Sequence, residues 1–196
     1  MSKQGILFIL TGPSGVGKGT VLAKVLERRD AYLSVSATTR EPREGEKHGV
    51  NYYFLTREQF EQTAAQNGFL EHAEFSGNCY GTPAAPVDEQ LSAGRDVVLE
   101  IEVQGAMQVH EKRPEAVRIF IAPPSFAELE KRLTGRGTED AAAVQRRLET
   151  AKHELTLAPQ FDYIVVNQTV EQAVSDVLAI MQAESCRAAR REYQII

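Results

Sequence analysis

The sequence has only two cysteines, Cys79 and Cys186, among its 196 residues. They form neither a CxxC pair nor a zinc-ligand spacing, so a disulfide framework or a zinc module does not explain the fold. We expect two ordinary thiols in a reducing compartment. The histidines also lack a metal-ligand spacing, which predicts surface or packing roles for His48, His72, His110 and His153.

The chain also lacks a basic excess and a long apolar run. Its formal net charge is -5 and its pI is near 5.5, whereas domains that bind a nucleic-acid backbone usually carry a basic excess on one face. No apolar run approaches the roughly 18 residues of a membrane span, and the N-terminus lacks the apolar region of a signal peptide. We therefore expect a cytoplasmic protein with no nucleic-acid partner and no membrane partner.

Internal repeats and low-complexity tracts are absent, and the hydrophobic content of 42% suits one globular domain. Short apolar runs instead alternate with helical patterns. The expected strands are Ile6–Leu10, Asp96–Ile101, Val117–Ile121 and Tyr163–Val166. The expected helices are Thr20–Leu26, Glu102–Lys112, Ser125–Leu133 and Val170–Glu184. This alternation predicts an α/β domain in which helices flank a parallel sheet.

Two polar segments interrupt the alternation and are interpreted as insertions in one domain. The first spans about 38–94 and is expected to hold strands at Asn51–Leu55 and Phe69–Phe75 and a helix at Arg57–Gln66. The second, at about 134–143, has the composition of a mobile loop between two helices. The core is then formed by about 1–37, 95–133 and 144–196.

A GxxxxGK motif lies between the first strand and the first helix, which is the context that phosphate binding demands. Glycines allow the backbone N–H groups to converge on phosphate oxygens at a helix N-terminus, and the lysine adds positive charge. The motif consists of Gly12, Pro13, Ser14, Gly15, Val16, Gly17, Lys18, Gly19 and Thr20. The alternative is a purely structural glycine-rich turn. Gly19 replaces the usual Ser or Thr ligand of magnesium, so no direct protein ligand is assigned, and Thr20 is the nearest candidate.

Paired arginines suggest a second anion site. Arg40 and Arg43 flank a proline turn and suit a phosphate monoester, to which Tyr52 and Tyr80 add phenolic donors. The alternative is solvated surface charge. Two acids, Glu100 and Glu102, lie at the end of the strand expected near Val97, and the period of two in a strand points both to one face of the sheet. Acids in this place suit a position near magnesium. The alternative is that they contact solvent or a lysine.

These motifs resemble the guanylate kinase family in order and spacing over nearly the whole chain. The resemblance rests on Gly12 to Gly15 with Lys18, Thr38-Thr39-Arg40 through Arg43, Gly49, Tyr52-Tyr53-Phe54, Phe69-Leu70-Glu71, Gly77 to Thr82 and Gly135-Arg136-Gly137-Thr138. Its most specific part runs from Thr38 to Leu55. The resemblance implies a P-loop kinase with a GMP-binding insertion and a short lid. Its implied reaction is the Mg²⁺-dependent transfer of a phosphoryl group from ATP to GMP.

The resemblance also implies residue roles. For GMP these are phosphate ligands Arg40, Arg43, Tyr52 and Tyr80, guanine ligands Ser36, Glu71 and Thr82, and Glu102 near the guanine or the water shell of the metal. For ATP they are the phosphate loop and Asn167 near the adenine, with Lys18, Arg40, Arg132, Arg136 and Arg147 as the catalytic charges. The chemistry of Glu71 agrees, because one carboxylate accepts from both N1–H and the 2-amino group of guanine, whereas adenine N1 offers a lone pair. We expect dGMP to be accepted as well.

Two other functions stay open at this point. One is a related P-loop kinase that acts on another phosphorylated acceptor, such as a ribose phosphate. The other is a non-catalytic guanylate kinase-like module that binds peptides. The presence of Lys18 argues against the module, and the set Ser36, Glu71 and Thr82 argues against a ribose phosphate. A homo-oligomer is also left open.

Overall fold

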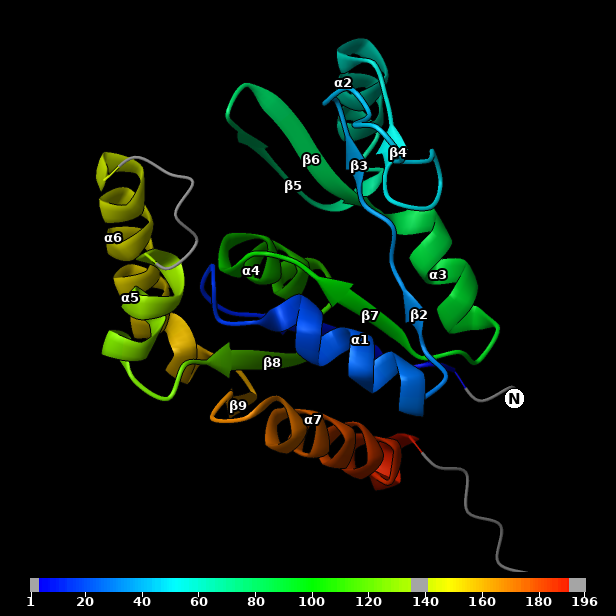
Figure 1. Cartoon of the computed structure of the whole chain (residues 1–196). Helices are drawn as coiled ribbons and strands as arrows, with labels where there is room; N and C mark the ends of the chain where they lie inside the picture. The colour runs from blue at the N-terminus through cyan, green and yellow to red at the C-terminus, as the bar shows by residue number, and fades with distance from the viewer. Residues whose placement is uncertain (1–3, 135–140, 191–196) are drawn as a thin grey trace, which may run out of the picture.

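The core of the protein is a five-stranded sheet in which all strands are parallel (Figure 1). The computed structural model describes residues 4–134 and 141–190. The strands lie in the order β2-β7-β1-β8-β9. Their bounds are β1 Leu7–Thr11, β2 Tyr32–Leu33, β7 Val97–Glu100, β8 Val117–Ala122 and β9 Tyr163–Val166. The α/β class predicted from the alternation is confirmed.

The strand β1 lies in the middle of this sheet and is buried along its whole length. It pairs with β7 on one side, Leu7 opposite Val97, and with β8 on the other, Phe8 opposite Val117. A strand covered on both faces needs apolar side chains on both, which explains its continuous apolar run. Because all strands are parallel, their carboxyl ends share one edge of the sheet.

Helices cover both faces of the sheet (Figure 1). The helices α1 (Lys18–Arg28) and α7 (Val170–Ser185) lie side by side on one face. Residues of α5 (Phe126–Thr134) and α6 (Ala141–Leu157) join the same hydrophobic cluster. The opposite face is covered by α3 (Ala84–Ser92) and α4 (Val103–Lys112). Two short 3-10 helices, η1 (Ala158–Gln160) and η2 (Ala188–Arg190), follow α6 and α7.

The first insertion forms a second sheet with its own small hydrophobic core. Its strands lie in the order β4-β3-β6-β5, with bounds β3 Ala37–Thr38, β4 Tyr53–Phe54, β5 Phe69–Phe75 and β6 Asn78–Pro83. The helix α2 (Arg57–Ala65) begins with a capping box between Thr56 and Gln59 and packs Phe60 against Phe69, ring centroids 4.4 Å apart. Cys79 is buried in this core, whereas Cys186 is exposed.

The helix α4 joins the insertion to the core. The Gln108 side chain accepts from the backbone N–H of His72 and donates to its carbonyl, both at 3.2 Å. The Lys112 ammonium donates to the carbonyl of Phe69 at 2.9 Å. Because all three bonds reach the backbone of β5, they fix this strand against the core whatever its side chains are.

Some expected elements differ from those observed. The ranges predicted for β9 and β5 match, whereas β6 and α3 were not predicted. The sequence of β6 contains Gly81 and ends at Pro83, and α3 contains Pro86, so neither shows a clear period. The segment of α3 was included in the expected insertion, but its Val87 and Leu91 pack into the core. No helix in the described ranges is long and apolar enough to cross a membrane.

Candidate active site

The phosphate loop connects the carboxyl end of β1 to the amino end of α1, as the motif predicted. Gly17 precedes α1 with a φ of 95°, in the left-handed region that favours glycine. A Cβ there would lie 2.8 Å from Nδ2 of Asn167. That buried amide donates to the carbonyl of Val16 at 2.8 Å, so the end of β9 supports the loop. The predicted adenine contact of Asn167 stays a prediction.

The Lys18 ammonium donates to the Gly12 carbonyl of the loop at 2.5 Å. Burial lowers the pKa of Lys18, while Glu100, Glu154 and Glu102 act in the opposite direction. The lysine thus faces both the loop and a group of acids. This is the place in which a cation would meet the terminal phosphates of a bound nucleotide.

Two of the three predicted catalytic arginines that flank the second insertion reach the phosphate loop. The Arg147 guanidinium on α6 donates to Oγ of Ser14 at 2.7 Å. Arg132 on α5 lies with Nη1 3.4 Å from the Val16 carbonyl and also contacts Glu128 on its own helix. The third, Arg136, lies outside the described residues. The helices that carry these two guanidiniums, α5 and α6, lie next to each other (Figure 1).

Three carboxylates surround Lys18. Burial raises the pKa of Glu100, opposed by Lys18. Burial raises the pKa of Glu154 to about 7, with Lys18 lowering it and Glu102 raising it further. Sequence reasoning found Glu100 and Glu102 from their strand end but missed Glu154. Its place on α6, far along the chain, gave no local signal, and only the packing of α6 brings it to the lysine.

Most of the predicted guanine and phosphate ligands line a cavity of about 280 Å³ between the second sheet and α4. The lining residues are Ser36, Tyr52, Glu71, Ala73, Phe75, Tyr80, Gly81, Glu100, Ile101, Glu102, Gln104 and Gly105. Glu100 belongs to this cavity and also interacts with Lys18. One end of the cavity therefore lies beside the phosphate loop.

Glu71 is the buried acid of the cavity. Its Oε1 accepts a hydrogen bond of 2.7 Å from the hydroxyl of Thr82, which is itself fully buried. Burial raises the pKa of Glu71, the Thr82 hydrogen bonds lower it, Glu102 raises it and Lys112 lowers it. Gly105 makes room for the carboxylate, since a Cβ there would lie 2.8 Å from Oε2. The sequence singled out Glu71 and Thr82 but not Gly105.

Three of the four predicted phosphate ligands, Arg40, Tyr52 and Tyr80, lie close together. The rings of Tyr52 and Tyr80 meet edge to face at 6.3 Å, and the Arg40 guanidinium lies 5.5 Å from the centre of the Tyr52 ring. Arg40 is additionally bonded to Glu46, a residue that the sequence did not single out. Arg43 is exposed on the same loop.

The donors near the phosphate loop suit magnesium held largely by substrate phosphates and water. Thr20 is exposed in the first turn of α1, and a Cβ at Gly19 would lie 3.5 Å from a Glu100 oxygen. Within the described ranges, no group of three or more His, Cys, Asp or Glu residues is arranged to hold a metal ion. A metal that keeps most of its water shell fits a site with these few oxygen donors.

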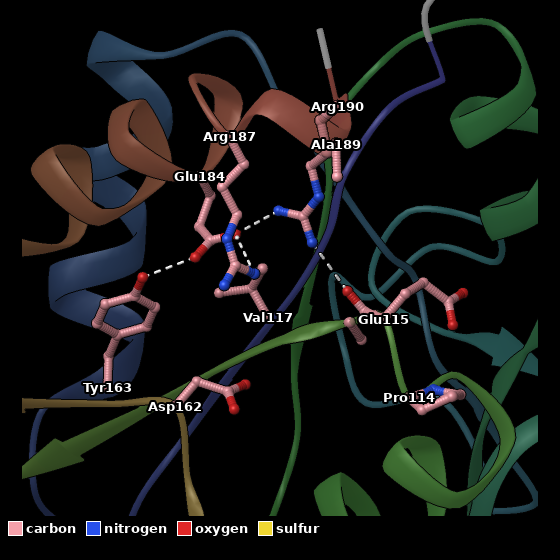
Figure 2. A pocket seen from close by; sticks show the side chains of 10 residues that line it. Pro114, Glu115, Val117, Asp162, Tyr163, Glu184, Arg187, Ala189 and Arg190 are labelled. Carbon is pink, nitrogen blue, oxygen red and sulfur yellow. Dashed lines mark hydrogen bonds and ion pairs between the residues drawn. The ribbon is translucent and has the colours of Figure 1, made fainter.

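A larger cavity of about 690 Å³ lies at the opposite edge of the sheet, where β8 and β9 begin (Figure 2). Several of its polar groups bond to one another. The buried carboxylate of Glu184 accepts from the Tyr163 hydroxyl at 2.6 Å and from Arg190, and Arg190 also donates to the carbonyl of Glu115 at 3.0 Å. This network attaches the C-terminal end of α7 to the start of β8 and β9.

The fold and the site define a P-loop kinase for a small phosphorylated acceptor. The defining features are the parallel sheet, the phosphate loop with its lysine, and the adjoining cavity lined by acids and tyrosines. The comparisons specify the family. The family model for guanylate kinase matches residues 4–184. A guanylate kinase from Thermus thermophilus is 56% identical over 95% of this chain and 85% of its own length. That of a Synechococcus species is 52% identical over 94% of this chain and 100% of its own length.

A solved structure gives the same result. The crystal structure of guanylate kinase from Anaplasma phagocytophilum has a TM-score of 0.76 and 35% sequence identity, and the match covers 96% of this chain and 90% of that one. The chain therefore belongs to the guanylate kinase family. The resemblance drawn from the motifs is confirmed.

Proposed function

We propose that this enzyme transfers the γ-phosphoryl group of ATP to GMP and releases ADP and GDP. The observation that carries the proposal is that the cavity and the phosphate loop share one neighbouring residue, Glu100. This carboxylate lines the cavity that holds Glu71 and also interacts with Lys18 of the phosphate loop. A purine monophosphate in the cavity is thereby brought towards a nucleotide on the loop. The curated relatives named guanylate kinase support the same reaction.

In this proposal Glu71 reads the base, with Ser36, Thr82 and Glu102 as its neighbours. An ionised Glu71 accepts from the two adjacent N–H groups of guanine, and the Thr82 hydroxyl holds one of its oxygens. Adenine would place a lone pair against the same carboxylate and leave it unpaired. A buried polar group left unpaired by the wrong base discriminates strongly.

The phosphate of GMP is assigned to Arg40, Arg43, Tyr52 and Tyr80. A phosphate monoester has a second pKa of about 6 and is mostly a dianion at neutral pH, so the acceptor needs no general base. Catalysis then consists of positioning the two anions and neutralising their charge. The other positive charges assigned to the substrate phosphates are Lys18 and the three arginines in or beside the second insertion, Arg132, Arg136 and Arg147.

Magnesium, when bound with ATP, supplies charge neutralisation at the phosphates. Thr20, and Glu100 or Glu102 through water, are the residues of this chain that would hold it. The loop residues from Gly12 to Thr20 bind the phosphates of ATP, and Asn167 supports them. We also propose that dGMP is a substrate, because the assigned contacts are to the base and the phosphate, and that the enzyme acts in the cytoplasm.

An ADP-release assay across GMP, dGMP, AMP, CMP, UMP and a ribose phosphate tests the proposal. We expect turnover with GMP and dGMP and little with the others. Turnover with the ribose phosphate, or GMP binding without turnover, would support one of the two alternative functions instead. In the same assay Lys18→Met should abolish turnover while calorimetry still detects GMP, because the lysine serves the donor.

Glu71→Gln tests the base pocket separately. The amide presents a mixed donor and acceptor edge, so it no longer accepts from both guanine N–H groups. We expect KM for GMP to rise and the preference for GMP over AMP to fall, with KM for ATP nearly unchanged. An unchanged preference would show that Glu71 does not read the base.

A further inference from the structure

The loop that carries the two phosphate-site arginines is closed by Glu46. Nη2 of Arg40 lies 2.9 and 3.0 Å from the two Glu46 oxygens, and the backbone N–H of Arg43 donates to Oε2 at 2.8 Å. The Glu46 N–H returns a bond of 3.0 Å to the Arg43 carbonyl. Gly45, with a φ of 85°, makes this tight turn possible. One carboxylate thus connects both arginine positions.

The same contacts fix how the Arg40 guanidinium is oriented. Nη1 donates to the Glu41 carbonyl at 2.7 Å, and the rings of Tyr52 and Phe54 lie 5.5 and 5.9 Å from the guanidinium carbon. A guanidinium has more N–H donors than these bonds use, so some remain for a substrate anion. Held on several sides, the group loses little further conformational freedom when that anion binds.

The pair is also shielded from solvent. The Arg40 and Glu46 side chains are only 16% and 18% exposed. The hydrogen bond from Arg40 holds the pKa of Glu46 below its usual value, and the Arg43 N–H acts in the same direction. Glu46 is therefore ionised at neutral pH and forms charge-assisted bonds, which are stronger and better oriented than neutral ones.

A carboxylate beside an anion site has two interpretations. It could stand in for the substrate phosphate and leave when GMP arrives, or it could remain and hold the arginine. The contacts favour the second interpretation. Glu46 is bonded to one edge of Arg40 and to the backbone of its own turn, so its departure would open the loop that presents both arginines. A stand-in would instead lie among the side-chain donors that converge on the phosphate.

We infer that Glu46 is a positioning residue for the acceptor, holding Arg40 so that its remaining N–H donors face the phosphate of GMP. This inference rests on the proposed function of the same site. It assigns a role to a residue that does not itself touch the substrate. It also predicts whether the affinity for GMP falls or rises when the charge of Glu46 is removed. Removing a negative charge near an anion site should tighten anion binding by Coulomb attraction alone, whereas loss of positioning weakens it.

The test compares Glu46→Gln with Glu44→Gln, which removes the same charge from an exposed position of the same loop. Calorimetry with GMP should show at least about tenfold weaker binding for Glu46→Gln and little change for Glu44→Gln. Binding of guanosine, which lacks the phosphate, should be equal in wild type and Glu46→Gln. KM for ATP should also be unchanged.

A double-mutant cycle shows whether Glu46 acts through Arg40. Arg40→Ala and the double variant Arg40→Ala/Glu46→Gln should bind GMP equally weakly, because Glu46 has nothing left to orient. Glu46→Asp keeps the charge with a shorter side chain and should fall between wild type and Glu46→Gln. The same substitution provides a folded variant if the amide destabilises the loop.

Several results would overturn the inference. Tighter GMP binding by Glu46→Gln identifies a stand-in for phosphate, and unchanged binding removes any role. Equal losses for GMP and guanosine indicate damage to the whole insertion, and additive losses in the cycle indicate independent action. If the wild-type enzyme itself does not bind GMP, the proposed function fails rather than the role of Glu46.

Discussion

The side-chain amide of Asn167 donates a hydrogen bond of 2.8 Å to the backbone carbonyl of Val16, although the two residues are 151 positions apart in the chain. This bond joins the end of β9 to the middle of the phosphate loop. The geometry of the donor site therefore depends on the edge strand of the sheet as well as on the motif itself. It also gives Asn167 a structural role in the phosphate loop that does not require contact with the adenine.

Asn167→Ala should raise KM for ATP by about tenfold, because it removes the 2.8 Å hydrogen bond to the Val16 carbonyl and leaves the loop less ordered. KM for GMP should change little. Asn167→Asp should be worse, since a carboxylate cannot donate to the carbonyl and repels the ATP phosphates. Gln168→Glu, which adds the same charge at the exposed neighbour, is the control. Equal effects of the two acidic variants would show that charge alone matters.

Gly105→Ala should weaken GMP binding by about tenfold or more. The new methyl group would lie 2.8 Å from a Glu71 oxygen and 3.2 Å from its carboxyl carbon, so the acid must move. Alanine is favoured over glycine within a helix by about 1 kcal/mol, which offsets part of the strain, so the protein should still fold. Steady-state kinetics should show a raised KM for GMP at an unchanged KM for ATP. An unaltered KM for GMP would contradict the steric role of Gly105.

Glu154→Gln should raise the thermal stability of the ligand-free enzyme at alkaline pH. Burial raises the pKa of Glu154 to about 7, above the value of an exposed glutamate, so the folded state binds the proton more tightly than the unfolded state. Its ionised form is thus destabilising above about pH 7, and the penalty disappears as the pH falls towards the unfolded pKa. The gain from the amide should be larger at about pH 8 than at about pH 5.5.

Scanning calorimetry at the two pH values measures this difference. The control is Glu149→Gln, an exposed position on the same helix, for which the change in melting temperature should be small and independent of pH. A stabilisation by Glu154→Gln that is equal at both pH values would contradict the raised pKa. A loss of stability at alkaline pH would show that attraction to Lys18 outweighs burial.

Tyr163→Phe should lower the free energy of unfolding by about 2 kcal/mol, because the phenol donates to the buried carboxylate of Glu184 at 2.6 Å (Figure 2). The hydrogen bond with Glu184 raises the pKa of Tyr163, followed by burial, so the phenol stays protonated and donates at neutral pH. Urea denaturation measures the change. Because this network lies at the edge opposite the phosphate loop, kinetic constants should stay close to those of wild type, and a large kinetic effect would refute that separation.

Local signals predicted much of the fold and part of the site. The phosphate loop was predicted because its residues are adjacent in sequence and its function resides mainly in the backbone. The strand β9 was predicted because a run of only four residues, rich in β-branched side chains, favours a strand over a helix. By contrast, β6 is specified by pairing with β5 and β3 rather than by its own period, and it was missed. Glu46 was missed for a similar reason, since a glutamate in a polar turn has no distinguishing pattern.

The sequence by itself determined the α/β class, the phosphate loop and the family, because these depend on short-range periodicity and on motifs whose residues are neighbours in the chain. Only the tertiary structure decided that Glu154 faces Lys18, that Gly105 makes room for Glu71 and that Asn167 supports Val16. These relationships depend on the packing of helices and strands that are distant in the chain. Burial and electrostatic attraction act through space, so no local pattern of residues encodes which partners meet.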